Sequence, residues 1–93
     1  MEKNLILEHH DSTNKTYKHL AHTVNLILRK DFDSIYSISY RTLERYAVGD
    51  TLPTKTIIIK AIAKMLKVEP LDLVQNLKEY RKNLKQRCNS DIK

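Results

Sequence analysis

The sequence predicts a small all-α domain, and three observations carry that prediction. Its 93 residues are enough chain for one domain but not for two independent cores. It contains one glycine and two prolines, whereas β-hairpins and glycine-rich phosphate loops need glycine at defined turns. Apolar residues recur at helical spacing in several separate stretches. We therefore expect a single domain over 1–93, a bundle of about five helices with its core within 14–74.

The N-terminal half contains one clear helical pattern between two ambiguous segments. Residues 2–9 include a short apolar stretch that predicts either a helix or an extended arm. The polar cluster at 11–14 is typical of a helix N-cap, and the apolar stripe after it predicts an amphipathic helix over about 14–30. The following residues 32–39, FDSIYSIS, fit either a short helix or an irregular apolar plug.

The next helix has the sharpest local signals at both ends. Ser39 is a good N-cap for a helix over 40–47, because its hydroxyl can accept a hydrogen bond from a first-turn N–H. Gly49, the only glycine, follows where a left-handed C-terminal cap is needed. These two residues predict the beginning and the end of the helix.

Two more helices are expected in the C-terminal half. A stripe of isoleucines predicts a helix over about 55–67, with Thr54 or Thr56 as its N-cap. Proline then begins a last helix over about 70–86, where it is tolerated in the first turn. Residues 87–93 are expected to fray.

Charge is distributed unevenly along the chain. The net charge is +6, yet residues 1–38 carry five basic and five acidic side chains, and residues 39–93 carry twelve and six. An excess confined to one part of a fold suits a polyanionic partner. No stretch approaches the length of a membrane span, and the N-terminus lacks the pattern of a signal peptide. We therefore expect a cytoplasmic protein with no membrane partner.

Enzymatic chemistry has little support in the sequence. Cys88 is the only cysteine, so an internal disulfide and a multi-cysteine zinc site are both excluded. The four histidines have no recognisable metal-ligand spacing, and no nucleophile-elbow, phosphate-loop or metalloprotease motif is present. We expect no cofactor, no metal and no catalytic residue.

Residues 37–74 carry a motif in which cap, apolar and proline positions fall in a fixed order. The motif resembles the second half of the lambda-repressor-like (Cro or XRE type) helix-turn-helix family, and the whole resemblance spans about 16–74. The matching residues are Ser39, Thr42, Leu43, Arg45, Tyr46, Gly49, Pro53, Ala63, Leu66, Val68, Leu71, Asp72 and Leu73. The first half departs from the family pattern. Either 28–38 contains an insertion, or the helix over 14–30 is the family's first helix and the second is degenerate.

The resemblance implies that the helix over 40–47 enters the major groove of DNA. With Leu43 facing the core, the outer face presents the predicted base contacts, which are Tyr40, Arg41, Glu44 and Arg45. The predicted phosphate contacts are Ser39, Thr42, Thr54, Lys55 and Lys60. The alternative interpretation is an ordinary solvated helix face with an i,i+3 ion pair.

The last helix has a heptad-like row of apolar side chains with basic residues beside it, which predicts a packed terminal helix, a dimer seam or a basic arm along DNA phosphates. The row consists of Leu73, Leu77, Tyr80 and Leu84. We expect a homodimer that binds double-stranded DNA as a sequence-specific repressor of a phage, plasmid or other mobile element. The alternatives are the antitoxin of a toxin–antitoxin pair and a protein-binding inhibitor, for example of a nuclease, built on the same scaffold.

Overall fold

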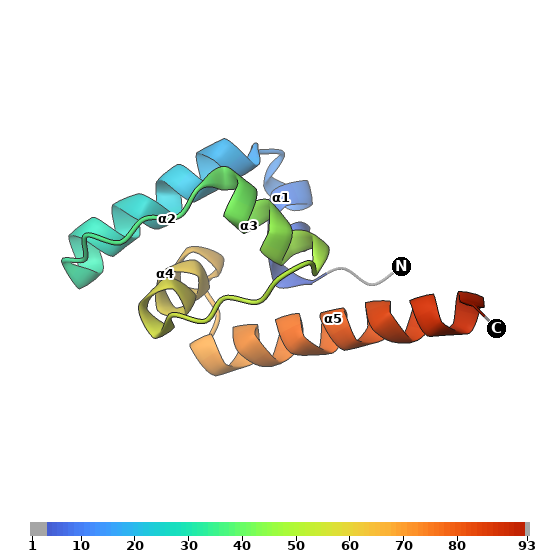
Figure 1. Cartoon of the computed structure of the whole chain (residues 1–93). Coiled ribbons are helices and arrows are strands. Elements are labelled where there is room, and N and C mark those ends of the chain that lie inside the picture. Colours follow the sequence, from blue (N-terminus) through green and yellow to red (C-terminus); the bar gives the residue numbers. More distant parts are fainter. Residues whose placement is uncertain (1–3, 93) are drawn as a thin grey trace.

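A computed structural model of the chain describes residues 4–92, with side chains through residue 84. The described residues form five α-helices and no strand, so the predicted all-α fold is confirmed (Figure 1). The helices are α1 (Leu5–Thr13), α2 (Tyr17–Phe32), α3 (Tyr40–Val48), α4 (Thr56–Leu66) and α5 (Pro70–Ile92).

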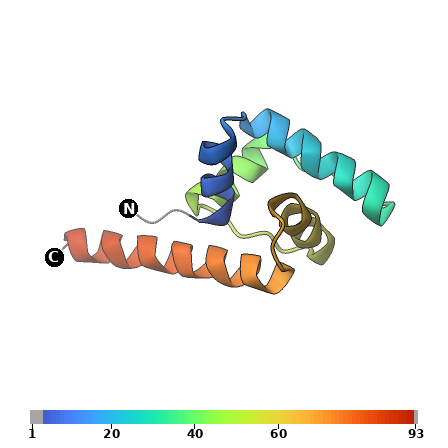
Figure 2. The same cartoon turned by 180° about the vertical axis from the view of Figure 1, so that it is seen from behind.

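The first four helices cluster together, and α5 lies along one side of the cluster. Helix α2 packs on both α3 and α4, α4 packs on α5, and α1 rests mainly on α3. Seen from the front and from behind, the C-terminal part of α5 projects past the other helices (Figures 1 and 2). This projection makes the chain elongated, with extents of 49 × 26 × 20 Å.

All five helices contribute to one apolar core, which is wider than the predicted 14–74. Ile6 of α1 and Leu77 of α5 are as fully buried as the central residues of α2 and α4. The core extends beyond 14–74 because α1 packs on α3, α4 and α5, and α5 packs on α4. The buried apolar residues are Ile6, Leu20, Ala21, Val24, Leu28, Leu43, Ala47, Ile58, Ala61, Ile62, Ala63, Leu73 and Leu77.

The ambiguous 2–9 segment is a helix from Leu5 onward, and it continues through the residues predicted to cap the next helix. Asn14 is the left-handed C-cap of α1, with φ 56°, a conformation that asparagine tolerates better than most residues. The N-cap of α2 is Thr16, whose hydroxyl accepts a hydrogen bond from the His19 N–H at 3.2 Å. The cap predicted at 11–14 is therefore wrong.

Helix α3 confirms both of its predicted ends. The Ser39 Oγ accepts from the Thr42 N–H at 3.2 Å, and Gly49 adopts φ 83°. Glycine is needed at this position for a second reason. A Cβ at residue 49 would lie only 2.6 Å from Leu84 Cδ1, so α5 packs directly on the turn after α3.

Two other predicted boundaries need correction. Helix α4 has Lys55 at its N-cap and no side-chain capping hydrogen bond, so neither Thr54 nor Thr56 caps it. Helix α5 continues to Ile92, past the predicted end at 86 and through the segment expected to fray. The segment after 86 contains neither proline nor glycine, so no local breaker ends the helix earlier.

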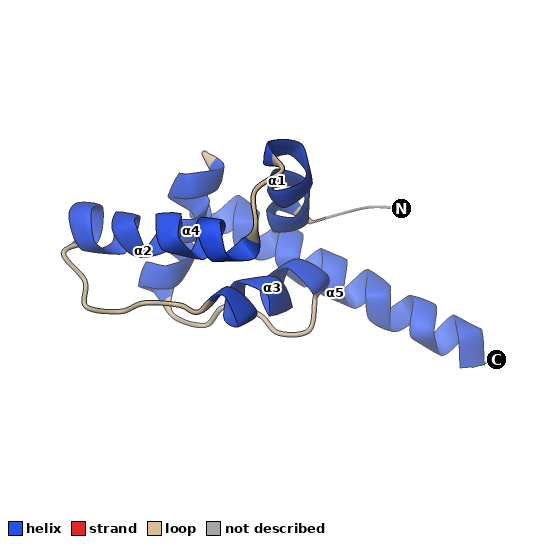
Figure 3. Ribbon diagram, turned by 90° about the horizontal axis from the view of Figure 1, so that it is seen from above, coloured by secondary structure: helices blue, strands red, loops and turns tan. Residues whose placement is uncertain are grey.

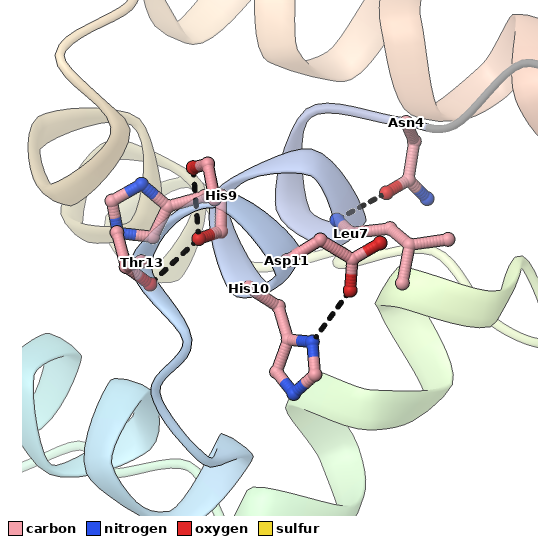
Figure 4. A network of polar contacts seen from close by, with 7 residues as sticks. Asn4, Leu7, His9, His10, Asp11 and Thr13 are labelled. Atoms are coloured by element: carbon pink, nitrogen blue, oxygen red, sulfur yellow. Dashed lines mark hydrogen bonds and ion pairs between the residues drawn. The ribbon is translucent and has the colours of Figure 1, made fainter.

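A buried asparagine ties the first helix to the rest of the bundle. Asn4 is only 1% exposed. Its Oδ1 accepts from the Leu7 N–H at 2.9 Å and so caps α1 (Figure 4). Its Nδ2 donates to the carbonyl oxygens of Tyr46 and Ala47, at 3.1 and 2.9 Å, near the end of α3. One side chain therefore satisfies backbone groups of two helices that are far apart in the sequence.

Replacing Asn4 by alanine is expected to destabilise the fold by about 2–3 kcal/mol, because the change removes an N-cap and leaves two buried carbonyl groups without this donor. Thermal unfolding followed by circular dichroism should show a melting temperature lower by roughly 10 °C. Asn83→Ala is the matched control, since Asn83 is exposed on α5. Equal melting temperatures for the two variants would contradict a stabilising role for the Asn4 hydrogen bonds.

Candidate nucleic-acid interface

Helix α3 presents a polar outer face because its apolar residues are turned inward. Leu43 and Ala47 are fully buried in the core. The four predicted base contacts, Tyr40, Arg41, Glu44 and Arg45, are all exposed on the remaining surface of the helix. The structure therefore brings these side chains together on one accessible helix face. Whether they contact bases remains a prediction.

Two of these four side chains already have neighbours within the chain. The Lys18 Nζ lies 5.3 Å from the centre of the Tyr40 ring, so the start of α2 flanks the start of α3. The Arg45 Nε lies 3.9 Å from Asp50 Oδ2, and both side chains are exposed. Arg41 and Glu44 form no ion pair among the described residues. Arg41 is therefore the arginine of this face that is better placed to contact a base.

Residues 33–39, here called the linker, connect α2 to α3 without helical structure. Asp33 ends α2 with φ 48°, and the Ser34 N–H donates to the Leu28 carbonyl at 2.9 Å. Asn25 of α2 then clamps Ile38 by two hydrogen bonds to its backbone, at 2.9 and 3.1 Å. The linker is therefore attached to α2 at both ends, and it is neither a helix nor a buried plug.

Residues 28–38 divide between a helix and a loop. A helix, α1, precedes α2, and α2 is the helix that packs on α3. The residues through Phe32 belong to α2, and the rest form the linker. That residues 28–38 are an insertion in the family pattern stays a prediction.

A pocket of about 230 Å³ lies where the linker, the start of α3 and the start of α4 meet. It contains four of the five predicted phosphate contacts, Ser39, Thr42, Thr54 and Lys55. Lys60 is exposed further along α4 and does not line the pocket. The other lining residues are Tyr36, Ser37, Ile38, Tyr46 and Ile58. Four phosphate contacts that were predicted from two separate segments of the sequence therefore line one pocket.

The groups around this pocket are suited to an anion. The Lys55 Nζ lies 4.2 Å from the centre of the Tyr36 ring, which places its charge at the pocket. The Ser39 and Thr42 hydroxyl oxygens are 3.0 Å apart. Burial raises the pKa of the Tyr46 phenol, whose hydroxyl is a hydrogen-bond donor at neutral pH even at its ordinary pKa of about 10. Hydroxyls and an ammonium group are donors that phosphate oxygens accept.

The linker, α3 and the loop that follows α3 lie along the same side of the molecule (Figure 3). Sequence reasoning included only Ser39 of the linker in the site, although Tyr36, Ser37 and Ile38 also line the pocket. The alternation of serine with large apolar residues in SIYSIS was the available signal, but it did not distinguish a buried plug from an exposed strip.

The predicted dimer seam packs within its own chain. Leu73 and Leu77 are buried in the bundle, and Leu84 and Tyr80 lie against the turn at Gly49. A heptad row marks a face that needs covering, and here α4, α1 and the turn at Gly49 cover it. Leu73 and Leu77 are therefore not part of an intermolecular seam, whereas Tyr80 and Leu84 are half-exposed and their place in a dimer seam stays a prediction.

The histidines near the N-terminus have structural contacts. The His10 ring stacks on the Tyr17 ring, with centroids 4.2 Å apart, and its Nδ1 lies 3.1 Å from Asp11 Oδ1 (Figure 4). Burial lowers the pKa of His9, and the nearby Lys15 lowers it further. Within the described residues, no group of three potential ligands is placed to hold a metal ion. The side chain of Cys88 lies outside the described residues.

No family model, curated protein or solved structure matches this chain. None of the described helices is both long and apolar enough to span a membrane.

Proposed function

We propose that the protein binds double-stranded DNA through α3 and acts as a sequence-specific transcriptional regulator. Two observations carry the proposal: the exposed polar side chains of α3, and the pocket lined by hydroxyls and Lys55 at the start of the same helix. Arg41 and its neighbours on α3 would contact base edges, and the pocket would receive a backbone phosphate. The basic surplus of residues 39–93 supports a polyanionic partner.

A dimer on a two-fold site is part of the proposal, because one short helix reads few base pairs. Leu73 and Leu77 serve the core of their own chain. The pairing of two chains would therefore use another surface, for which the projecting part of α5 is the best placed (Figure 2). Two copies of α3 would then occupy half-sites about one helical turn apart.

The proposal is tested by selecting bound sequences from a random duplex pool with the wild type, Arg41→Ala and Lys55→Ala. Arg41→Ala should weaken the best site by roughly 10- to 100-fold per half-site and relax the preference at one base position. Lys55→Ala should weaken all sequences about equally and preserve the preference. Both side chains are exposed, so helical content and melting temperature should be unchanged.

The two variants control for each other, since each removes one exposed cation from the same surface. If Arg41→Ala selects the same sites with the same preference, base recognition by this face of α3 is wrong. If the wild type enriches no sequence, the protein is not a sequence-specific regulator.

A further inference from the structure

The linker holds two large apolar side chains out in solvent. Ile35 is 95% exposed and Tyr36 is 48% exposed. Scattered apolar residues are common on protein surfaces, but these two are consecutive and lie beside the candidate interface. Ile35 therefore makes almost no contact with the rest of its own chain.

Their position is fixed by hydrogen bonds on both sides. The Tyr36 N–H donates to the Ser34 Oγ at 3.1 Å, and Ser34 is itself bonded to the end of α2. Two residues after Tyr36, the Asn25 side chain clamps the backbone of Ile38. Lys55 contacts the Tyr36 ring from the α4 side. The linker therefore presents Ile35 from a supported backbone, which limits the entropy lost when it contacts a partner.

Cations outnumber carboxylates around the linker, in which Asp33 is an exposed carboxylate, and this balance favours a polyanion. Lys55 is beside Tyr36, and Arg29 and Lys30 are exposed in the last turn of α2. Asp31 in that turn is paired with Lys64 at 2.9 Å. An apolar tip flanked by cations is the combination with which proteins enter a DNA groove, because the cations bind phosphates while the tip contacts bases.

We propose that Ile35 is a wedge that inserts at a base step of the DNA bound by α3 and bends the duplex. This inference rests on the proposed function, and it adds a second contact element that reads deformability instead of base edges. Pyrimidine–purine steps such as TA are the preferred sites, because they unstack most easily. Tyr36, held by Lys55, packs beside the wedge and supports it.

The experiment uses the full chain and the best duplex of about 30 bp recovered from the random pool. One copy of the duplex carries 2-aminopurine at each TA step, and the fluorescence of 2-aminopurine rises when the base unstacks. Another copy carries a dye at each end, so that the distance between the dyes reports bending. Wild type, Ile35→Ala and Ile35→Leu are compared, with Leu71→Ala as the matched control. Leu71 is 83% exposed on α5, outside this surface.

The wild type, Ile35→Leu and Leu71→Ala are expected to raise the 2-aminopurine fluorescence and to bring the duplex ends closer. Ile35→Ala should lose both signals and about 10-fold in affinity while retaining the wild-type melting temperature. Wild-type binding without unstacking or bending overturns the wedge and leaves the proposed function intact. If Ile35→Ala gives the wild-type 2-aminopurine fluorescence and bending, the wedge is also overturned and the proposed function stands. Ile35 and Tyr36 would then form a surface for another contact, such as a protein. Failure of the wild type to bind any duplex at about 50 mM salt overturns the proposed function and the wedge together.

Discussion

Raising the NaCl concentration from about 50 to about 200 mM is expected to weaken binding to duplex DNA about 10³-fold. The exposed cations Lys55 and Lys60, together with Arg29 beside the linker, on each of two chains would give roughly six phosphate contacts. Each contact releases condensed counterions, so the slope of log affinity against log salt should be near −5. Fluorescence anisotropy of a labelled duplex across a salt series measures this slope directly.

Substitutions separate the specific contacts from general charge. Lys60→Ala should make the slope shallower by about one per contacting chain. Lys82→Gln removes an exposed cation of α5, outside the predicted contacts, and should leave the slope unchanged. Undetectable binding to mixed genomic fragments at about 50 mM salt would refute DNA binding. A stoichiometric protein complex that survives high salt would instead favour the antitoxin or inhibitor alternatives.

Leu77→Glu is expected to unfold the chain. Leu77 is 2% exposed and packs from α5 into the core, so the substitution removes apolar packing and buries a carboxylate. A cost above about 4 kcal/mol is a large share of the roughly 5–10 kcal/mol that stabilises a domain of this size. Circular dichroism at 25 °C should show loss of helix, and heating should show no cooperative transition.

Leu71→Glu is the matched control on the same helix, because Leu71 is exposed. It should retain the fold and melt within a few degrees of the wild type. A folded, cooperatively melting Leu77→Glu chain that has merely become monomeric would show that Leu77 lies in an intermolecular seam after all. Light scattering at micromolar concentration distinguishes that outcome from unfolding.

Local sequence signals predicted α3 and its accessible face well. A serine cap, a glycine in the left-handed region and an apolar spacing of four residues all act within one helix, so no distant contact is needed to interpret them. The same reasoning placed Tyr40, Arg41, Glu44 and Arg45 on the outside, where the structure has them. It failed at 11–14, where the polar residues end one helix and precede the cap of the next.

Contacts between segments far apart in the chain could not be predicted in this way. The heptad row of α5 shows that a face needs covering, but it does not distinguish a second copy from the turn at Gly49. Asn4 looks like any polar residue near a chain end, yet it bonds to carbonyls more than 40 positions away. In the alternating linker, Ile35 and Tyr36 are exposed while Ile38 packs against the core. The backbone of Ile38 is held by two hydrogen bonds to Asn25, thirteen residues earlier.

The helical class, the ends of α3 and the polar face of that helix follow from local sequence, because each depends on propensity, capping and spacing within a few residues. Three other properties come from tertiary packing. It places Leu73 and Leu77 in the chain's own core, gathers Ser39, Thr42, Thr54 and Lys55 around one pocket, and leaves Ile35 exposed beside them. These properties depend on which segments pack together, and packing depends on the shape and burial of the whole chain.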